Sequence, residues 1–191
     1  MNNKVVNFYP LVGKLLIANP NIDDVRFHRS VIYIYEHSEE RGALGLVINK
    51  PSEKIKCQDI FQQLGYPLSD KKFPPILLGG PEHINNGFIL HTDEYKRNTT
   101  LSIDNGVCLT ETQDILYDIA INSGPEMFLL ALGRASWRAG QLEDELMSNV
   151  WISVIPDRDV LFQTPYSQRW EYGLSLLGIK AHQLFSGFGK S

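Results

Sequence analysis

Two short runs of β-branched, aromatic and other apolar residues, separated by a polar turn, constrain the fold of this chain more than any other feature. The first run spans residues 30–37 and the second spans 43–49, with Pro51 just beyond it. Such residues favour strands, and the segment between the runs is rich in charged and small residues. The close spacing predicts an antiparallel hairpin.

The rest of the chain mixes strand and helix patterns without regular alternation. Strands are predicted over 11–18, 76–78, 87–92, 101–103, 107–109, 127–132, 150–155 and 159–162. Helices are predicted over 57–64, 110–121, 140–149 and 164–178, the second opening on a capping box at Thr110 and the third exposing Glu143, Asp144 and Glu145. This order favours an α+β fold with a largely antiparallel sheet over a doubly wound parallel fold.

No linker, low-complexity tract or internal repeat divides the 191 residues. We therefore expect one domain over 1–191, with about 1–8 and 180–191 loose at its ends.

Composition narrows the function classes and the compartment. The net charge is −4, and proteins that coat nucleic acid or anionic membrane need surplus Lys and Arg. Without a recognisable helix-turn-helix carrying a basic second helix, direct DNA binding is not expected. Cys57 and Cys108 form no CxxC pair, and no secretory signal or membrane-length apolar run is present. We expect a cytoplasmic protein with reduced thiols and no membrane association.

The common catalytic and cofactor motifs are missing from the sequence. It contains no GxxxxGK[ST], GxGxxG, HExxH, EF-hand loop or GxSxG. No two histidines stand at i, i+4 on a predicted helix or i, i+2 on a predicted strand. We therefore expect no metal site and no cofactor.

Polar residues at predicted strand ends are the first candidate site. Glu36, His37, Asn49 and His91 lie at or near the ends of three predicted strands. If the hairpins bring these ends together, a histidine beside carboxylates can act as a general base or ligand. The alternative, which we favour, is that the histidines are hydrogen-bonded structural residues.

The Gly79-Gly80-Pro81-Glu82 turn is the second candidate. Paired glycines let a ligand approach the backbone, and successive N–H groups can cradle an anion. Pro81 removes one donor, so a simple tight turn is the favoured interpretation.

The predicted loop at 133–141 is the third candidate, with Arg134, Trp137, Arg138 and Gln141. Two arginines beside an aromatic ring, just before a predicted helix, can grip an anion or stack on a base. The favoured alternative buries Trp137 and pairs both arginines with carboxylates of the next helix.

Four stretches of the sequence carry a resemblance to a known family. They are GKLLIA at 13–18 with Phe27 and RSV at 29–31; EH at 36–37 with GALGLVINKP at 42–51; LGGP at 78–81 with GFILH at 87–91; and ALG at 131–133 with Trp137, GQLE at 140–143 and NVW at 149–151. Together, in order, they resemble the bacterial YqgE/AlgH family. The resemblance implies an α+β fold with a bent, barrel-like sheet flanked by helices, and a regulatory label in alginate synthesis. It brings no agreed catalytic residues.

We therefore expect a non-enzymatic regulatory or interaction protein with an unidentified protein or small-molecule partner. The transcriptional-regulator label comes from the resemblance alone. The alternative is a small-ligand binder or atypical enzyme built around Glu36, His37 and His91.

Overall fold

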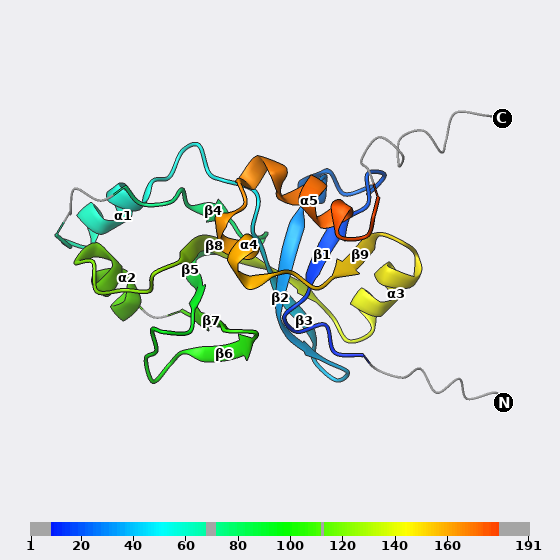
Figure 1. The fold of residues 1–191 in the computed structure, drawn as a ribbon, viewed down its shortest axis with the longest axis horizontal. Coiled ribbons are helices and arrows are strands. Elements are labelled where there is room, and N and C mark those ends of the chain that lie inside the picture. The colour runs from blue at the N-terminus through cyan, green and yellow to red at the C-terminus, as the bar shows by residue number, and fades with distance from the viewer. Residues whose placement is uncertain (1–8, 68–71, 112, 180–191) are drawn as a thin grey trace.

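A computed structural model describes residues 9–67, 72–111 and 113–179, which form a curled sheet with helices on both of its faces (Figure 1). The strands are β1 (Leu15–Ala18), β2 (Val31–Ser38), β3 (Gly42–Val47), β4 (Leu77–Leu78), β5 (Glu82–Thr92), β6 (Leu101–Asp104), β7 (Val107–Thr110), β8 (Phe128–Trp137) and β9 (Trp151–Val154). The helices are α1 (Cys57–Gln63), α2 (Gln113–Ala120), α3 (Gln141–Met147), α4 (Arg158–Gln163) and α5 (Arg169–Ser175), with 3-10 turns η1 (Val25–Phe27) and η2 (Tyr166–Gln168).

The sheet runs in the order β6-β7-β5-β8-β3-β2-β1-β9, and its pairings along this path are antiparallel. The short β4 joins β8 in parallel. The predicted hairpin is confirmed as β2 and β3, with Tyr33 opposite Leu46 and a register shift between Ile34 and Glu36. The α+β class and the bent, largely antiparallel sheet are therefore confirmed.

Alternation along the strands gives the sheet two apolar faces. Leu15, Ile17 and Tyr33 face a core inside the curl, which α4 and α5 cover from above (Figure 1). Gly173 of α5 sits so close to β1 that a Cβ atom there would lie 2.3 Å from Ile17 Cδ1. The indole of Trp170 donates a hydrogen bond of 2.8 Å to the Ala18 carbonyl, so α5 is tied directly to β1.

The outer face carries two separate clusters at opposite ends of the molecule (Figure 1). One packs α3 through Leu142 against β1, β2 and the tryptophans of β8 and β9. The other packs α1 and α2 through Phe61 and Ile115 against β5 and β8. Since β8 contributes to both clusters, it links the two ends of the sheet.

Two local predictions are wrong. The strand predicted at 159–162 is helix α4, because Asp157 Oδ1 accepts the Val160 amide at 3.2 Å and starts a helical turn. The capping box predicted at Thr110 does not form, because α2 begins at Gln113 and Thr110 is the last residue of β7. The Thr110 hydroxyl instead makes hydrogen bonds to His91 and Thr100.

Two segments predicted as turn or loop are strands. Residues 82–86 belong to β5 and residues 133–137 to β8, so both strands are longer than their apolar runs indicate. The expected loose ends, 1–8 and 180–191, lie outside the described residues. Within the described ranges, none of the helices has the length and apolar character that crossing a bilayer requires.

Candidate functional site

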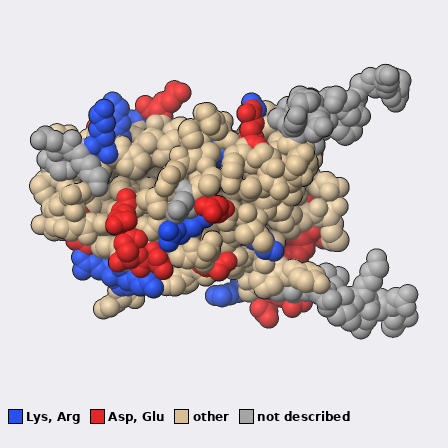
Figure 2. Space-filling model, in the orientation of Figure 1, with Lys and Arg blue, Asp and Glu red and all other residues tan. Residues whose placement is uncertain are grey.

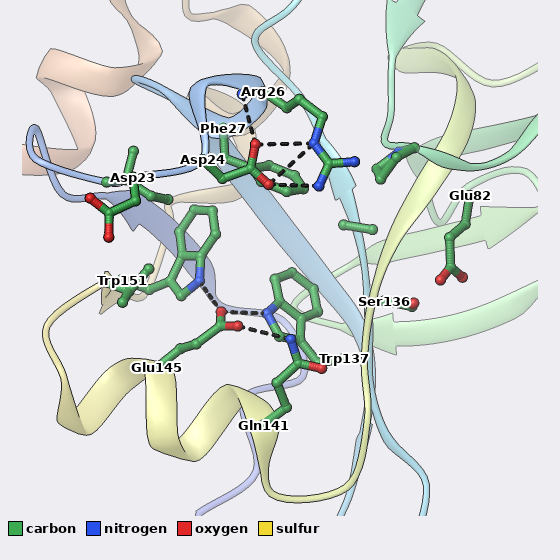
Figure 3. Close-up of a pocket in the computed structure, with 14 residues that line it drawn as sticks. Asp23, Asp24, Arg26, Phe27, Glu82, Ser136, Trp137, Gln141, Glu145 and Trp151 are labelled. Carbon is green, nitrogen blue, oxygen red and sulfur yellow. Dashed lines mark hydrogen bonds and ion pairs between the residues drawn. The ribbon is translucent and has the colours of Figure 1, made fainter.

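A cleft of about 520 Å³ opens between η1, the C-terminal half of β8, α3 and β9 (Figure 3). Its walls combine aromatic rings with carboxylates, and Gln141 and the indoles of the two tryptophans meet at the carboxylate of Glu145. We call it the tryptophan cleft, after Trp137 and Trp151.

The carboxylate of Glu145 lies at the base of the tryptophan cleft. Its Oε2 accepts hydrogen bonds from the indole Nε1 atoms of Trp137 at 2.8 Å and Trp151 at 2.7 Å. Its Oε1 accepts one from Gln141 Nε2 at 2.9 Å. Gln141 and Glu145 share a face of α3 because they are four residues apart. The helix therefore presents one acceptor group to the end of β8 and the start of β9 at once.

Three aromatic rings form the apolar wall. The Trp137 and Trp151 centroids are 6.0 Å apart at 82°, and Phe27 meets Trp151 at 5.7 Å and 76°. These are edge-to-face geometries, which aromatic pairs prefer to a face-to-face sandwich. Both tryptophans are buried, whereas Phe27 is half-buried and stands closer to the mouth.

An ion pair stands at the rim. Asp24 caps η1 by accepting the Arg26 amide at 3.0 Å, and its carboxylate also binds the Arg26 guanidinium, at 2.7 Å for the shortest bond. The side-chain hydrogen bond from Arg26 is the main reason that the pKa of Asp24 is lowered. The guanidinium carbon also lies 5.8 Å from the centroid of Phe27. Asp23 and Glu82 complete the charged rim and are exposed (Figure 3).

A second hollow, also of about 520 Å³, lies on the other side of α3 and includes Leu11 and Met147 in its lining. There the buried ring of His37 accepts the Leu11 amide on Nδ1 at 3.1 Å and bonds Glu143 Oε1 through Nε2 at 2.8 Å. Because Nδ1 is an acceptor, the neutral ring must carry its proton on Nε2 and donate it to Glu143. His37 therefore anchors α3 to the end of β2.

The strand-end residues proposed as one site are not brought together. His37 pairs with Ala43 near the Trp137 end of β8, whereas His91 pairs with Phe128 at its other end. Nine residues of strand, about 30 Å of extended chain, separate those two ends. A joint catalytic role for the two histidines has no geometric support.

Glu36 and Asn49 are also apart from one another. Asn49 clamps the opposite end of the β2–β3 hairpin, where its side chain accepts the Val31 amide and donates to the Arg29 carbonyl, both at 2.8 Å. Glu36 is half-buried near the His37 end of the same hairpin. Asn49 therefore has a structural role in closing the start of β2.

His91 is a buried structural residue. Its Nδ1 donates to the Thr92 carbonyl and its Nε2 bonds the Thr110 hydroxyl, both at 2.9 Å. Burial, as the largest cause, lowers the pKa of the imidazole. These contacts use both ring nitrogens and agree with the structural interpretation favoured from the sequence.

Gly79 and Gly80 serve close backbone packing. The Gly79 amide donates to the Leu132 carbonyl at 2.8 Å, so it does not face a ligand. A Cβ on Gly79 would lie 2.3 Å from the carbonyl oxygen of Gly133, and one on Gly80 would lie 2.1 Å from the Arg134 carbonyl carbon. The glycines are needed because this turn crosses β8 backbone to backbone, where a Cβ atom would clash.

The 133–141 candidate is divided between the two faces of the sheet. Trp137 and Gln141 line the tryptophan cleft, as described above. Arg134 turns to the inner face, where it lies 5.9 Å from the Phe88 ring centroid and donates to the Tyr35 hydroxyl. An arginine pair therefore does not form beside Trp137.

The burial of Trp137 agrees with the alternative favoured from the sequence. The same alternative paired Arg134 and Arg138 with carboxylates of α3, and the structure shows other partners for these carboxylates. Arg138 is exposed, and its amide donates to Gln141 Oε1 at 3.1 Å. Glu143 and Glu145, expected to be largely solvated or paired with arginines, bind His37 and the two tryptophans instead.

Sequence reasoning missed Glu145, Trp151 and the η1 residues as members of one site. The spacing of Gln141 and Glu145 signals a shared helix face, but nothing local indicates that two indoles from different strands meet it. Their convergence depends on β9 pairing with β1 across the sheet.

Metal-ligand clusters and cysteine thiols are the two other kinds of site to consider among the described residues. Across 9–67, 72–111 and 113–179, no three His, Cys, Asp or Glu side chains gather as metal ligands. Cys57 and Cys108 are buried free thiols, and burial raises the pKa of Cys57 to about 11, which disfavours its thiolate.

Comparisons with known proteins agree with this fold. Residues 15–182 match a protein-family model, DUF179, described as AlgH-like. The chain is 40% identical to a UPF0301 protein of Methylobacterium nodulans over 188 residues, covering 94% of this chain and 89% of the relative. It is also 40% identical to a UPF0301 protein of Burkholderia cenocepacia, covering 91% and 92%.

Two solved structures share the architecture. The solution structure of the AlgH protein from Pseudomonas aeruginosa superimposes with a TM-score of 0.74 at 33% identity, covering both chains in full. The crystal structure of protein DIP2367 from Corynebacterium diphtheriae has a TM-score of 0.66 at 21% identity, covering 84% of this chain and 83% of the other, and supports the fold alone.

Proposed function

Since this chain belongs to the AlgH-like UPF0301 family, for which no biochemical function is established, we propose a function from its own geometry: it is a non-enzymatic binding protein whose ligand site is the tryptophan cleft. The proposal refines the expectation of a regulatory or interaction protein by naming the surface that binds.

The observation that carries the proposal is the fixed carboxylate of Glu145 between the two tryptophans. Two indole N–H groups and one amide N–H hold it in one position in the cleft. No His, Cys or Lys is among the described residues that line the cleft, and Ser136 is its one hydroxyl. Catalysis by nucleophile and base needs a pair within hydrogen-bond reach, whereas rigid aromatic walls with a few fixed polar groups suit binding.

We further propose that the whole chain works as one cytoplasmic domain and regulates through a small molecule or protein partner. The transcriptional-regulator label is compatible with an indirect role of that kind. The net charge of −4 argues against direct DNA contact, and so does the face drawn in Figure 2, on which Lys and Arg are interspersed with Asp and Glu.

The test is a binding titration read at the indoles. The chain has three tryptophans, and their Nε1–H resonances report on the cleft through Trp137 and Trp151 and on the inner core, on the other face of the sheet, through Trp170. Benzoate, benzamide and benzamidine are added separately, because they share a ring and differ in charge. We expect at least one to shift the two cleft resonances to saturation while Trp170 stays unmoved.

Two results would refute the proposal. One is that none of the three compounds moves Trp137 or Trp151 at millimolar concentration. The other is that all three tryptophan resonances move together, which would indicate a general change of the fold instead of occupation of the cleft.

A further inference from the structure

The charges around the tryptophan cleft are unbalanced. Asp23, Asp24, Glu82 and Glu145 supply four carboxylates to its lining, against the one guanidinium of Arg26. Asp24 and Arg26 bind each other, so three carboxylates remain without a cation in the lining.

Neighbouring cations do not remove this excess. Lys50 supports η1 from outside the cleft by donating to the Arg26 carbonyl, and counting its charge still leaves two more carboxylates than cations. Arg134 lies opposite Glu82 in the β5–β8 register and attracts it electrostatically, but its guanidinium is on the inner face, over Phe88, and attracts Glu111 as well; counting Arg134 still leaves one more carboxylate than cations.

Glu145 keeps its charge available to a ligand because its donors are neutral. Among the described residues, the hydrogen bonds to it come from two indoles and one amide. Such donors fix the carboxylate in space without cancelling its field, and the field is stronger where aromatic walls exclude water.

The aromatic wall, like the carboxylates, favours a positively charged ligand. The face of an aromatic ring carries negative potential and attracts a cation within about 6 Å of its centroid. The rim already shows this chemistry, because the Arg26 guanidinium lies 5.8 Å from the Phe27 centroid while binding both oxygens of Asp24 at 2.7–3.1 Å.

From these observations, and resting on the proposed function, we infer that the tryptophan cleft recognises a cationic group, a guanidinium or ammonium. The group enters the cleft beside the aromatic wall of Phe27, Trp137 and Trp151, with the carboxylates of Asp23 and Glu82 at the rim and that of Glu145 held by the two indoles. The source is an arginine or lysine side chain of a partner or a free small cation, since both present the same head group.

The experiment compares butylguanidinium with butylurea, which has nearly the same shape and no charge. Indole Nε1–H shifts of Trp137 and Trp151 follow both titrations, with Trp170 as the internal control. We expect a Kd for butylguanidinium about tenfold or more below that for butylurea, and a loss of this preference as NaCl is raised.

A double variant tests the charges. Asp23→Asn with Glu82→Gln alters two exposed side chains, so the fold is retained, which the indole spectrum without ligand verifies. The preference for butylguanidinium is expected to fall to about threefold or less. The matched control is Glu40→Gln in the exposed β2–β3 turn, which removes one carboxylate away from the cleft and keeps the preference.

A third pair of probes separates the two sources. The peptide acetyl-Gly-Arg-Gly-amide is compared with its citrulline counterpart, which replaces the guanidinium with urea. Tighter binding of the arginine peptide than of butylguanidinium points to a partner's side chain, and the reverse points to a free cation. Both outcomes support cation recognition.

Equal or tighter binding of butylurea or benzoate would overturn the inference, as would full preference for butylguanidinium in the double variant. These failures leave the proposed function standing, because a neutral or anionic compound would then occupy the cleft. The proposed function fails if no probe of any charge moves the two cleft resonances, or if Trp170 moves together with them.

Discussion

Two carboxylates on α3 stand two residues apart and have opposite surroundings. Glu145 faces the tryptophan cleft, where neutral indole and amide N–H groups hold it. Glu143 faces the second hollow, where its partner is the imidazole ring of His37. Two glutamates of the same short helix therefore have different roles: Glu145 holds the two tryptophans of the cleft, and Glu143 accepts a hydrogen bond from His37.

The comparison shows how one turn of helix can connect two regions of the sheet. Glu145 ties α3 to β8 and β9, and Glu143 ties it to β2. The two glutamates differ in their donors: indole and amide N–H groups at Glu145, and an imidazole N–H at Glu143.

The largest effect is expected for Glu145→Ala, which leaves the indole N–H groups of the buried Trp137 and Trp151 without their acceptor. Unsatisfied buried donors are costly, so the free energy of unfolding should fall by about 2–4 kcal/mol. Urea denaturation measures this loss. Asp144→Ala, at an exposed position of the same helix, is the control and should change stability by less than about 0.5 kcal/mol.

Glu145→Gln tests whether the loss in Glu145→Ala comes from the hydrogen bonds to the tryptophans, because the glutamine amide keeps one oxygen that can accept from the indoles. A loss of about 1 kcal/mol is expected, with both indole resonances still in hydrogen-bonded positions. If Ala and Gln cost the same, the hydrogen bonds to the tryptophans are not what Glu145 contributes.

Acid should destabilise the protein through His91, a buried histidine with neutral hydrogen-bond partners. His91 has a carbonyl and a hydroxyl as partners, and burial lowers the pKa of its folded state. The unfolded chain then binds a proton first, so stability falls as pH drops below about 6.5 and continues to fall until the folded-state pKa is reached. By pH 5 this contribution is at most about 2 kcal/mol.

Urea unfolding of the native chain and of His91→Gln between pH 8 and pH 5 measures the contribution of His91 to the pH dependence of stability. The variant is expected to be less stable at neutral pH but to lose less stability on acidification. If the free energy of unfolding changes equally with pH in both proteins, His91 is not the source of the acid sensitivity.

A smaller effect is expected for Glu143→Ala, which removes the acceptor of the His37 Nε2–H. The Glu143 side chain is 29% exposed, so solvent can partly replace it, and a loss of about 1 kcal/mol is expected. The Trp137 and Trp151 indole resonances should stay in place, in contrast with Glu145→Ala. Their movement would mean that the two sides of α3 are coupled.

The smallest effect is expected for Asp24→Asn at the cleft rim. Its ion pair with Arg26 is largely solvent-exposed, so stability should change by no more than about 0.5 kcal/mol. Butylguanidinium binding should weaken modestly, because Arg26 then presents an uncompensated positive charge to the cleft. Tighter binding in this variant would contradict the electrostatic account of the site.

Local chemistry made much of the fold predictable. The β2–β3 hairpin and the β6–β7 hairpin follow from strand-forming runs closed by short polar turns, and Asn105 and Gly106 adopt the positive φ values that such a turn needs. The errors also have a local cause: at 159–162 a strand-like apolar pattern gave way to the helix that Asp157 starts.

Only part of the tryptophan cleft could be predicted from the sequence. Trp137 and Gln141 were selected from the sequence, but as part of an anion-binding loop with Arg134 and Arg138. Alternation along β8 sends Arg134 to the opposite face, and this could not be known while 133–137 was assigned to a loop.

The sequence by itself determined the α+β class, the hairpins and the helix that carries Gln141 and Glu145, because turn chemistry and side-chain periodicity act over a few residues. Only the tertiary structure decided that Trp137 and Trp151 meet above Glu145, and that His37 and His91 do not meet at all. Those outcomes depend on strand order and on the curl of the sheet, which bring together β8, β9 and η1 from distant parts of the chain. Long-range pairing is selected by the packing of the whole core, so no local pattern specifies it.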